Sequence, residues 1–289
     1  MSSPTMAVAP PAVEQPRQSA GRVALYVLVI IFAIFFLFPL YVGISTALKS
    51  MGEVTRSSIW APPTAPTLEN FKLAWDALSK GFLNSVFLTI PAVIISSILG
   101  SLNGYVLAKW RFRGSNLIFA LILFGMFIPY QAILIPLVQF LQGVGAYGSI
   151  PGLILVHVIY GIPITTLIFR NYYVDVPTEL IESGTMDGAG FFGIYRHVVF
   201  PISVPAFVVV LIWQFTSVWN EFLFAVSITS NPVVQPITVA LAGLGASTAG
   251  TNYGMQMAGS LLTAVPTLLV YILLRRYFIR GLLAGSIKG

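Results

Sequence analysis

The hydrophobic pattern of the chain consists of six long apolar runs separated by shorter polar segments. Each run is close to or longer than the ~20 residues that an α-helix needs to cross a bilayer. The runs are continuous rather than alternating, which excludes a β-barrel. The pattern therefore predicts an all-α integral membrane protein with transmembrane helices at about residues 23–47, 82–108, 116–141, 150–169, 201–228 and 255–274. Pro129 and Pro136 interrupt the third of these runs.

The polar segments at the two ends predict the domain organisation. Residues 1–20 are rich in proline and small polar residues and cannot bury a core, so we expect a disordered cytoplasmic tail. The first apolar run is too long for a signal peptide and lacks a small-residue cleavage site. Residues 21–289 then form one transmembrane domain that ends in a short cytoplasmic tail at 281–289.

The distribution of basic residues predicts the orientation in the membrane. Under the positive-inside rule, lysine and arginine collect in cytoplasmic segments. The turns at 142–149 and 229–253 contain neither residue, whereas a basic cluster follows the second run and another follows the sixth. Eleven of the fifteen basic residues then lie inside, and four share the long outer segment 49–80. This orientation places both termini in the cytoplasm.

Composition narrows the class of protein further. Hydrophobic residues make up 57% of the chain, charged residues 8%, and the mean hydropathy is +0.89, which excludes a soluble globular domain. The net charge of +6 follows from the cytoplasmic basic clusters and does not indicate a nucleic-acid partner. Without cysteine, the chain has neither disulfides nor thiol ligands. Ser96, Gly100 and Gly104 repeat every four residues, a stripe of small residues that lets two helices approach closely.

One long segment, at about residues 171–200, mixes polar and apolar residues between the fourth and fifth runs. Pro177 suits a first helical position because its missing N–H would be unpaired there. Glu179 and Glu182 follow on one face, three residues apart. Gly188 can adopt the left-handed conformation that ends a helix. The segment predicts two short helices joined at a glycine elbow, which together would form a cytoplasmic docking surface.

The spacing within this segment resembles the EAA loop of ABC importer permeases. The family pattern reads Glu-Ala-Ala-x-x-x-Gly, nine residues, then Ile-x-Leu-Pro. The corresponding residues here are Glu182, Ser183, Gly184, Gly188 and Pro201, with Asp187 and Ala189 beside the glycine and Val198 and Phe200 as conservative replacements. The serine and glycine in place of two alanines keep the small size but lower the helix propensity. An ordinary connector between two spans is the alternative reading.

Further motifs resemble the carbohydrate importer permeases, and within them the shorter, maltose-G-type subunit. They are Asn70-Phe71-x-x-Ala74-Trp75, Leu83-Asn84-Ser85, Phe127-Ile128-Pro129, Trp219-Asn220-Glu221-Phe222 and Gly285-Ser286-Ile287-Lys288-Gly289. The stretch from Val156 to Asn171 is similar to glucose/mannose-type members in particular. The similarity covers residues 23 to 289.

The resemblance implies a type I ABC importer of five parts in a bacterial or archaeal inner membrane. The partners would be a second homologous permease, two ATPase subunits, an extracytoplasmic sugar-binding protein and the surrounding lipid. The EAA-like loop would sit in a cleft of one ATPase, with Glu182 paired to a basic residue there. ATP and magnesium would be held by that ATPase, and this chain would hold no cofactor and catalyse no reaction. Indeed, it contains no phosphate-binding loop motif.

The fifth run contains the most strongly polar face of any apolar segment. Gln214, Ser217 and Glu221 share one side of a helix, and Trp213 and Asn220 lie beside them. Polar groups in lipid are costly, so this face should look toward the bundle interior or a water-filled path. Tryptophan beside hydrogen-bonding groups suits sugar rings. The alternative is that Trp219 and Glu221, about 30 Å along the helix from Pro201, are ordinary residues at the outer boundary.

One histidine in an apolar run is a further candidate for the substrate path. His157 lies within the fourth run, where it can be a packed, hydrogen-bonded residue or can line a path. A secondary transporter or a membrane assembly factor stays an alternative, although the first would need coupling carboxylates at mid-membrane and the second a reactive cluster. The sequence does not specify which sugar is carried, because specificity in such systems rests largely on the other subunits.

Overall fold

The computed structural model describes residues 20–110, 112–245 and 252–286. Within these ranges the chain forms helices joined by short turns and contains no β-strand. The elements are α1 (Ala20–Ala47), α2 (Met51–Arg56), α3 (Glu69–Lys109), α4 (Ser115–Phe124), η1 (Gly125–Phe127), η2 (Tyr130–Ile133), α5 (Leu134–Gly143), α6 (Ile150–Val174), α7 (Glu179–Met186), α8 (Phe191–Ile194), η3 (Tyr195–Val199), α9 (Phe200–Ile202), α10 (Val204–Trp219), α11 (Leu223–Ile228), η4 (Pro232–Val234), α12 (Ile237–Gly245) and α13 (Tyr253–Ser286).

Four helices and two bent helix pairs are long and apolar enough to cross a membrane. The straight helices are α1, α3, α6 and α13. The bent pairs are 115–127 with 130–143, at 88°, and 191–202 with 204–219, at 78°. The predicted all-helical membrane fold is confirmed, with up to six spans if each bent pair counts as one.

The boundaries of the spans differ from those expected, most clearly in the second, the third and the fifth. The second span begins at Glu69 rather than near residue 82, and the side-chain amide of Asn70 anchors its first turn by donating to the carbonyls of Ala47 and Lys49. The third breaks at Pro129, whereas Pro136 sits in the first turn of α5, where no intrahelical N–H bond is needed. The fifth is interrupted at residues 220–222, between α10 and α11.

The predicted tails fall mostly outside this description. Residues 1–19 of the N-terminal tail and 287–289 of the C-terminal tail lie outside the described residues. Residue 20 already begins α1, and residues 281–286 are the last of α13, so the helix of the sixth span continues past the expected end at 274.

The small-residue stripe of α3 lies against α6, as predicted. A side chain at Gly100 would overlap Thr165, and one at Gly104 would come within 2.7 Å of the backbone nitrogen of Arg170. The hydroxyl of Thr165 also donates to the carbonyl of Ser96 across the contact, at 3.1 Å. The two backbones are therefore close enough that only glycine fits at both positions.

The segment between α1 and α3 is more ordered than its composition suggests. The Glu53 carboxylate of α2 accepts hydrogen bonds from the backbone N–H and the hydroxyl of Thr64, at 2.6 and 2.8 Å. These bonds lower the pKa of Glu53 because they favour its charged form. The lysine at position 49 is buried and donates to the carbonyl of Ser58.

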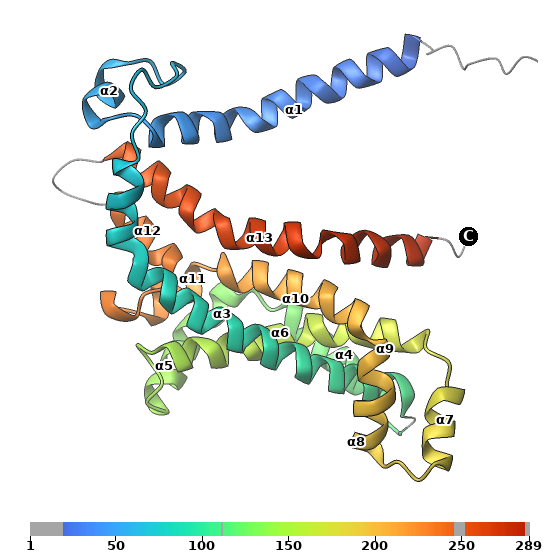
Figure 1. The fold of residues 1–289 in the computed structure, drawn as a ribbon. Coiled ribbons are helices and arrows are strands. Elements are labelled where there is room, and N and C mark those ends of the chain that lie inside the picture. The colour runs from blue at the N-terminus through green and yellow to red at the C-terminus, as the bar shows by residue number, and fades with distance from the viewer. Residues whose placement is uncertain (1–19, 111, 246–251, 287–289) are drawn as a thin grey trace, which may run out of the picture.

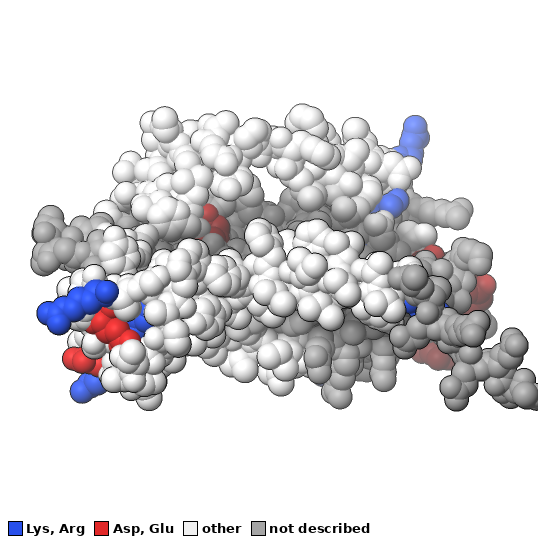
Figure 2. Space-filling view, turned by 90° about the horizontal axis from the view of Figure 1, so that it is seen from above, with Lys and Arg blue, Asp and Glu red and all other residues white. Residues whose placement is uncertain are grey.

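The helices are arranged around α3 and α6, with α10 and α13 beside them, while α1 extends away from this bundle (Figure 1). No residue of the most apolar stretch of α1 is buried inside the chain. Charged side chains gather at the two ends of the molecule, and the surface between them is almost free of charge (Figure 2). This arrangement is what a membrane protein with an apolar belt requires.

Candidate functional site

The predicted loop at about residues 171–200 forms two short helices and an elbow at one end of the molecule (Figure 1). The first, α7, begins at Glu179 rather than at Pro177, because the carbonyl of Thr178 accepts the first helical bonds, from Ile181 and Glu182. The expectation that Pro177 opens the helix is therefore wrong by two residues.

The elbow at Gly188 has the predicted left-handed conformation, with φ at +80°. The N–H of Gly188 binds the carbonyl of Thr185, and the N–H of Ala189 binds that of Gly184, both at 3.0 Å. This pair of bonds is the Schellman arrangement, which ends a helix and satisfies its last carbonyls. The elbow thus depends on the one residue type that tolerates this backbone conformation without strain.

The outward side of the loop carries most of the residues that the motif singled out. Glu179, Glu182, Ser183, Asp187 and Gly188 are exposed, as is Pro201 further on in α9, and Gly184 and Ala189 are half-buried. Two apolar side chains that the motif did not indicate join them, because Met186 is 88% exposed and Phe192 is 72% exposed. The loop therefore presents acidic groups and exposed hydrophobic groups together.

The inward side of the loop is held to the bundle by tyrosines that sequence reasoning missed. The hydroxyl of Tyr195, in the π-helical turn η3, donates to Ser101 of α3 at 2.8 Å. Ser101 also shares a 2.6 Å hydrogen bond with Tyr173 of α6. Tyr172 donates to the carbonyl of Ile202, again at 2.6 Å. These partners are far apart in sequence, so no local pattern indicated them.

A second candidate site is a cavity of about 650 Å³ between α6, α10 and α11. All six residues predicted for a substrate path line it. They are His157, Trp213, Gln214, Ser217, Asn220 and Glu221. Further aromatic side chains, including Tyr130 of η2 and Tyr160 of α6, complete the wall. A smaller cavity of about 460 Å³ shares Tyr130, Tyr160 and Trp213 with it. The helical spacing of the fifth span thus predicted one side of a real cavity.

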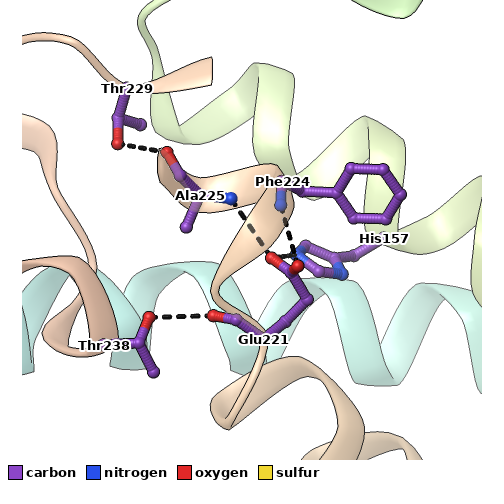
Figure 3. A network of polar contacts seen from close by, with 6 residues as sticks. All are labelled: His157, Glu221, Phe224, Ala225, Thr229 and Thr238. Atoms are coloured by element: carbon purple, nitrogen blue, oxygen red, sulfur yellow. Dashed lines mark hydrogen bonds and ion pairs between the residues drawn. The ribbon is translucent and has the colours of Figure 1, made fainter. Parts of the chain in front are cut away.

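Glu221 lies at the break between α10 and α11, within a network of polar contacts (Figure 3). Its two carboxylate oxygens accept the N–H groups of Phe224 and Ala225, at 2.8 and 3.1 Å. Its backbone carbonyl accepts a hydrogen bond from Thr238 at 2.8 Å. The side chain is 17% exposed. The carboxylate therefore caps the start of α11 and supports the break.

Trp219 is also engaged inside the chain. Its exposed fraction is 2%, and its ring nitrogen donates to the carbonyl of Thr263 in α13 at 3.0 Å. Gln214 is also buried and donates to Ser96 of α3 at 2.9 Å. The polar face of the fifth span therefore serves two purposes, since part of it joins neighbouring helices and part of it lines the cavity.

His157 lies beside Glu221 in the lining of the cavity (Figure 3). Its Nε2 atom lies 3.8 Å from Oε2 of Glu221, which is too long for a hydrogen bond. Its side chain is only 6% exposed, and Nε2 has no hydrogen-bond partner among the described residues. The ring packs edge-on against Phe224. A buried, oriented and unpartnered polar atom therefore points at the carboxylate.

No cluster of three or more histidine, aspartate or glutamate side chains that could hold a metal occurs in the described ranges. The tertiary structure brings the predicted cavity residues together at one place and the loop residues at another. The groups that sequence reasoning missed are Tyr195, Ser101 and Tyr173. Their only local signal was the richness of the loop in aromatic residues.

Known proteins resemble this chain both in sequence and in fold. Residues 96–281 match the family described as binding-protein-dependent transport system inner membrane component. The chain is 41% identical to the xylose/arabinose import permease protein of Haloferax volcanii, over 90% of this chain and 92% of that protein. It is 44% identical to a probable ABC transporter permease protein of Pyrococcus horikoshii, over 94% and 99%. A solved bacterial ABC transporter involved in importing the acidic polysaccharide alginate superposes with a TM-score of 0.79 at 22% identity, covering 91% and 98%.

Proposed function

The chain belongs to the family of binding-protein-dependent transport system inner membrane components, and from this premise we propose that it is the permease subunit of an ATP-driven sugar importer. It is a non-catalytic, multi-pass inner membrane protein of a prokaryotic ABC importer. The observation that carries the proposal is that the family match, residues 96–281, includes both the exposed loop and the cavity. A relative named for xylose and arabinose import supports a sugar as the cargo.

The loop is proposed as the site where an ATPase subunit binds. Its exposed acids and its exposed Met186 and Phe192 form a surface that could seat in a cleft with basic and apolar groups. The inward hydroxyl contacts would carry a movement of the loop to α3 and α6. ATP and magnesium would be held by that ATPase dimer, and a second permease and an external binding protein would complete the assembly.

The cavity is proposed as part of the path that the sugar takes. Its aromatic wall can stack on the apolar face of a sugar ring, and its polar groups can bind hydroxyls. Both termini and the loop would lie on the cytoplasmic side. This mechanism needs no reactive group in the chain, since closure of the ATPase dimer would open the path outward and hydrolysis would reset it.

The coupling role is tested by two single substitutions in the loop, Gly188→Val and Glu182→Lys. Gly188 has a positive φ, where a β-branched residue is strained by roughly 1–3 kcal/mol. We expect each variant to lower sugar uptake at least about tenfold and to weaken co-purification of the ATPase, which corresponds to ~1.4 kcal/mol or more. The measurements are uptake of labelled xylose and glucose by cells expressing the whole assembly, and the ATPase recovered with the tagged chain.

Gly190→Val is the matched control for the elbow. Gly188 and Gly190 both have open space where a side chain would go, but the φ of Gly190 is −75°, which any residue adopts. This variant should transport normally. Normal uptake and ATPase recovery in both test variants would contradict the docking role. Absence of sugar uptake by the unmodified assembly would contradict the proposed function itself.

A further inference from the structure

We propose that His157 and Glu221 form a clamp for one sugar hydroxyl, and that this clamp makes the cavity selective for uncharged sugars over anionic ones. The inference rests on the proposed function, because it assumes that the cavity lies on the sugar's path. The substrate class that fits this clamp is a neutral, polyhydroxylated ring. Acidic sugars such as hexuronates are disfavoured.

The distance between the two side chains sets the geometry of the clamp. Nε2 of His157 and Oε2 of Glu221 are 3.8 Å apart, so they do not bond directly. A hydroxyl oxygen on the cavity side can lie at about 2.8 Å from both atoms. It would accept a hydrogen bond from Nε2–H and donate its own proton to the carboxylate. A hydroxyl both donates and accepts, so it fits this pair, whereas an ether or an apolar group does not.

Both side chains are held in place before any ligand arrives. The carboxylate of Glu221 is fixed by the N–H groups of Phe224 and Ala225, which use one acceptor position on each oxygen. Each oxygen keeps a second lone pair for a ligand. His157 is held by burial in α6 and by the ring of Phe224. A buried Nε2 atom without a hydrogen-bond partner costs free energy. A hydroxyl that pairs with it removes this cost and therefore binds more tightly.

The aromatic side chains of the cavity wall suit the apolar face of a sugar. Trp213 of α10 is 55% exposed and lines the cavity, and Tyr130 of η2 lies in the same wall. Flat aromatic rings and a hydroxyl clamp in one cavity match a pyranose or furanose, which has C–H faces and an edge of hydroxyls. An elongated apolar ligand would leave the clamp unsatisfied.

The charges around the cavity give the selectivity. Glu221 is the acidic residue in its lining, and its carboxylate accepts two backbone N–H groups. Of the described residues that line the cavity, none is a lysine or an arginine. A carboxylate on the sugar would meet a like charge with no cation to offset it. The cavity therefore rejects anions without needing any steric block.

The test uses a reporter cysteine at Ser217, which lines the cavity in a chain that has no native cysteine. The full assembly carrying Ser217→Cys is prepared in membrane vesicles. Labelling of this chain is timed with cationic and anionic methanethiosulfonate reagents of similar size. All rates are corrected for the intrinsic reactivity of the two reagents, measured at a reference cysteine, Thr216→Cys. After this correction we expect the cationic reagent to react faster by about tenfold, given one nearby carboxylate. Glu221→Gln should abolish the corrected difference.

Protection from labelling tests the clamp. D-glucose or D-xylose, added in excess, should slow the labelling of Ser217→Cys severalfold, and D-glucuronate should not. His157→Phe keeps a ring against Phe224 but removes Nε2, so it should lose protection by the neutral sugars while keeping the preference for the cationic reagent. Thr216→Cys is the control, because Thr216 does not line the cavity and bonds to its own helix.

The outcomes separate this inference from the proposed function. Equal labelling rates with both reagents, or equal protection by glucuronate and glucose, would overturn the selectivity. Unchanged protection in His157→Phe would overturn the clamp. If any of these contradicting outcomes occurs while the unmodified assembly still transports a neutral sugar, the proposed function stands and only the inference about the clamp fails. If the unmodified assembly transports no sugar, the failure is that of the proposed function.

Discussion

At the scale of single residues, two glycines of α3 determine how closely the two central helices approach. A Cβ atom at Gly104 would lie 2.7 Å from the backbone nitrogen of Arg170 and 2.8 Å from Cβ of Phe169. Backbone atoms cannot move aside as a flexible side chain can, so the whole contact would have to shift. The close approach of the two helices therefore matters more for the stability of this fold than the low helix propensity of glycine.

Gly104→Ala should therefore destabilise the protein, by about 1–3 kcal/mol, because it overpacks the α3–α6 contact. The measurement is the midpoint of thermal unfolding of the purified chain in detergent. Gly43→Ala is the matched control, since Gly43 also lies within a helix but has nothing within 4 Å of the added methyl group. The control should be neutral or slightly stabilising. Equal midpoints for both variants would refute the packing argument.

At the scale of elements, the turn η3 connects the exposed loop to the bundle. Its Tyr195 reaches Ser101 of α3, which also bonds Tyr173 of α6, so one serine hydroxyl joins three elements. Ile194, just before the turn, and Val199, its last residue, are buried. A π-helical turn at this position lets the loop change direction while its aromatic side chains remain packed. The arrangement makes the loop's exit a rigid connection.

The double variant Ser101→Ala with Tyr195→Phe should loosen this connection without exposing the core. It removes hydrogen bonds worth about 0.5–1.5 kcal/mol each. We expect the ATPase to stay bound and the amount of sugar carried per ATP hydrolysed to fall severalfold. The measurement is uptake and hydrolysis together in reconstituted vesicles. Tyr26→Phe, at an exposed position in α1, is the control. An unchanged ratio in the double variant would show that η3 does not transmit the movement.

At the scale of the whole molecule, the face seen in Figure 2 carries charged side chains mainly toward its two ends and few between them. The cavity and the loop are separate regions of one helical framework, linked through α6 and α10. Helix α1 makes most of its surface available to lipid or to another subunit. The geometry alone does not specify which end faces the cytoplasm, so orientation remains a prediction from the basic residues.

Cysteine labelling in whole cells tests that orientation against the cysteine-free background. Val144→Cys, in an exposed turn that we place outside, should react with a membrane-impermeant thiol reagent. Asn116→Cys, near the basic cluster that we place inside, should react only after the membrane is permeabilised. Both positions are exposed, and neither belongs to the loop or to the lining of the cavity. The reverse labelling pattern would overturn both the cytoplasmic placement of the loop and its proposed docking to an ATPase.

The sequence alone determined the features that depend on local periodicity and backbone chemistry. Long apolar runs predicted the helical membrane fold, because an isolated backbone in lipid must satisfy its own hydrogen bonds. Gly188 predicted the elbow, because its backbone conformation excludes other residues. The spacing of Gln214, Ser217 and Glu221 predicted a polar face, because residues on a helix share a side at fixed intervals. Each of these inferences needs only a few neighbouring residues.

The tertiary structure alone decided what depends on distant parts of the chain. The break at residues 220–222 exists because Glu221 caps α11, which no periodicity indicates. The apposition of His157 and Glu221 results from the packing of α6 against the broken fifth span. The contact between Tyr195 and Ser101 joins residues 94 positions apart. Such contacts arise from how helices pack in three dimensions, and their energies come from burial and pairing that the sequence order does not encode locally.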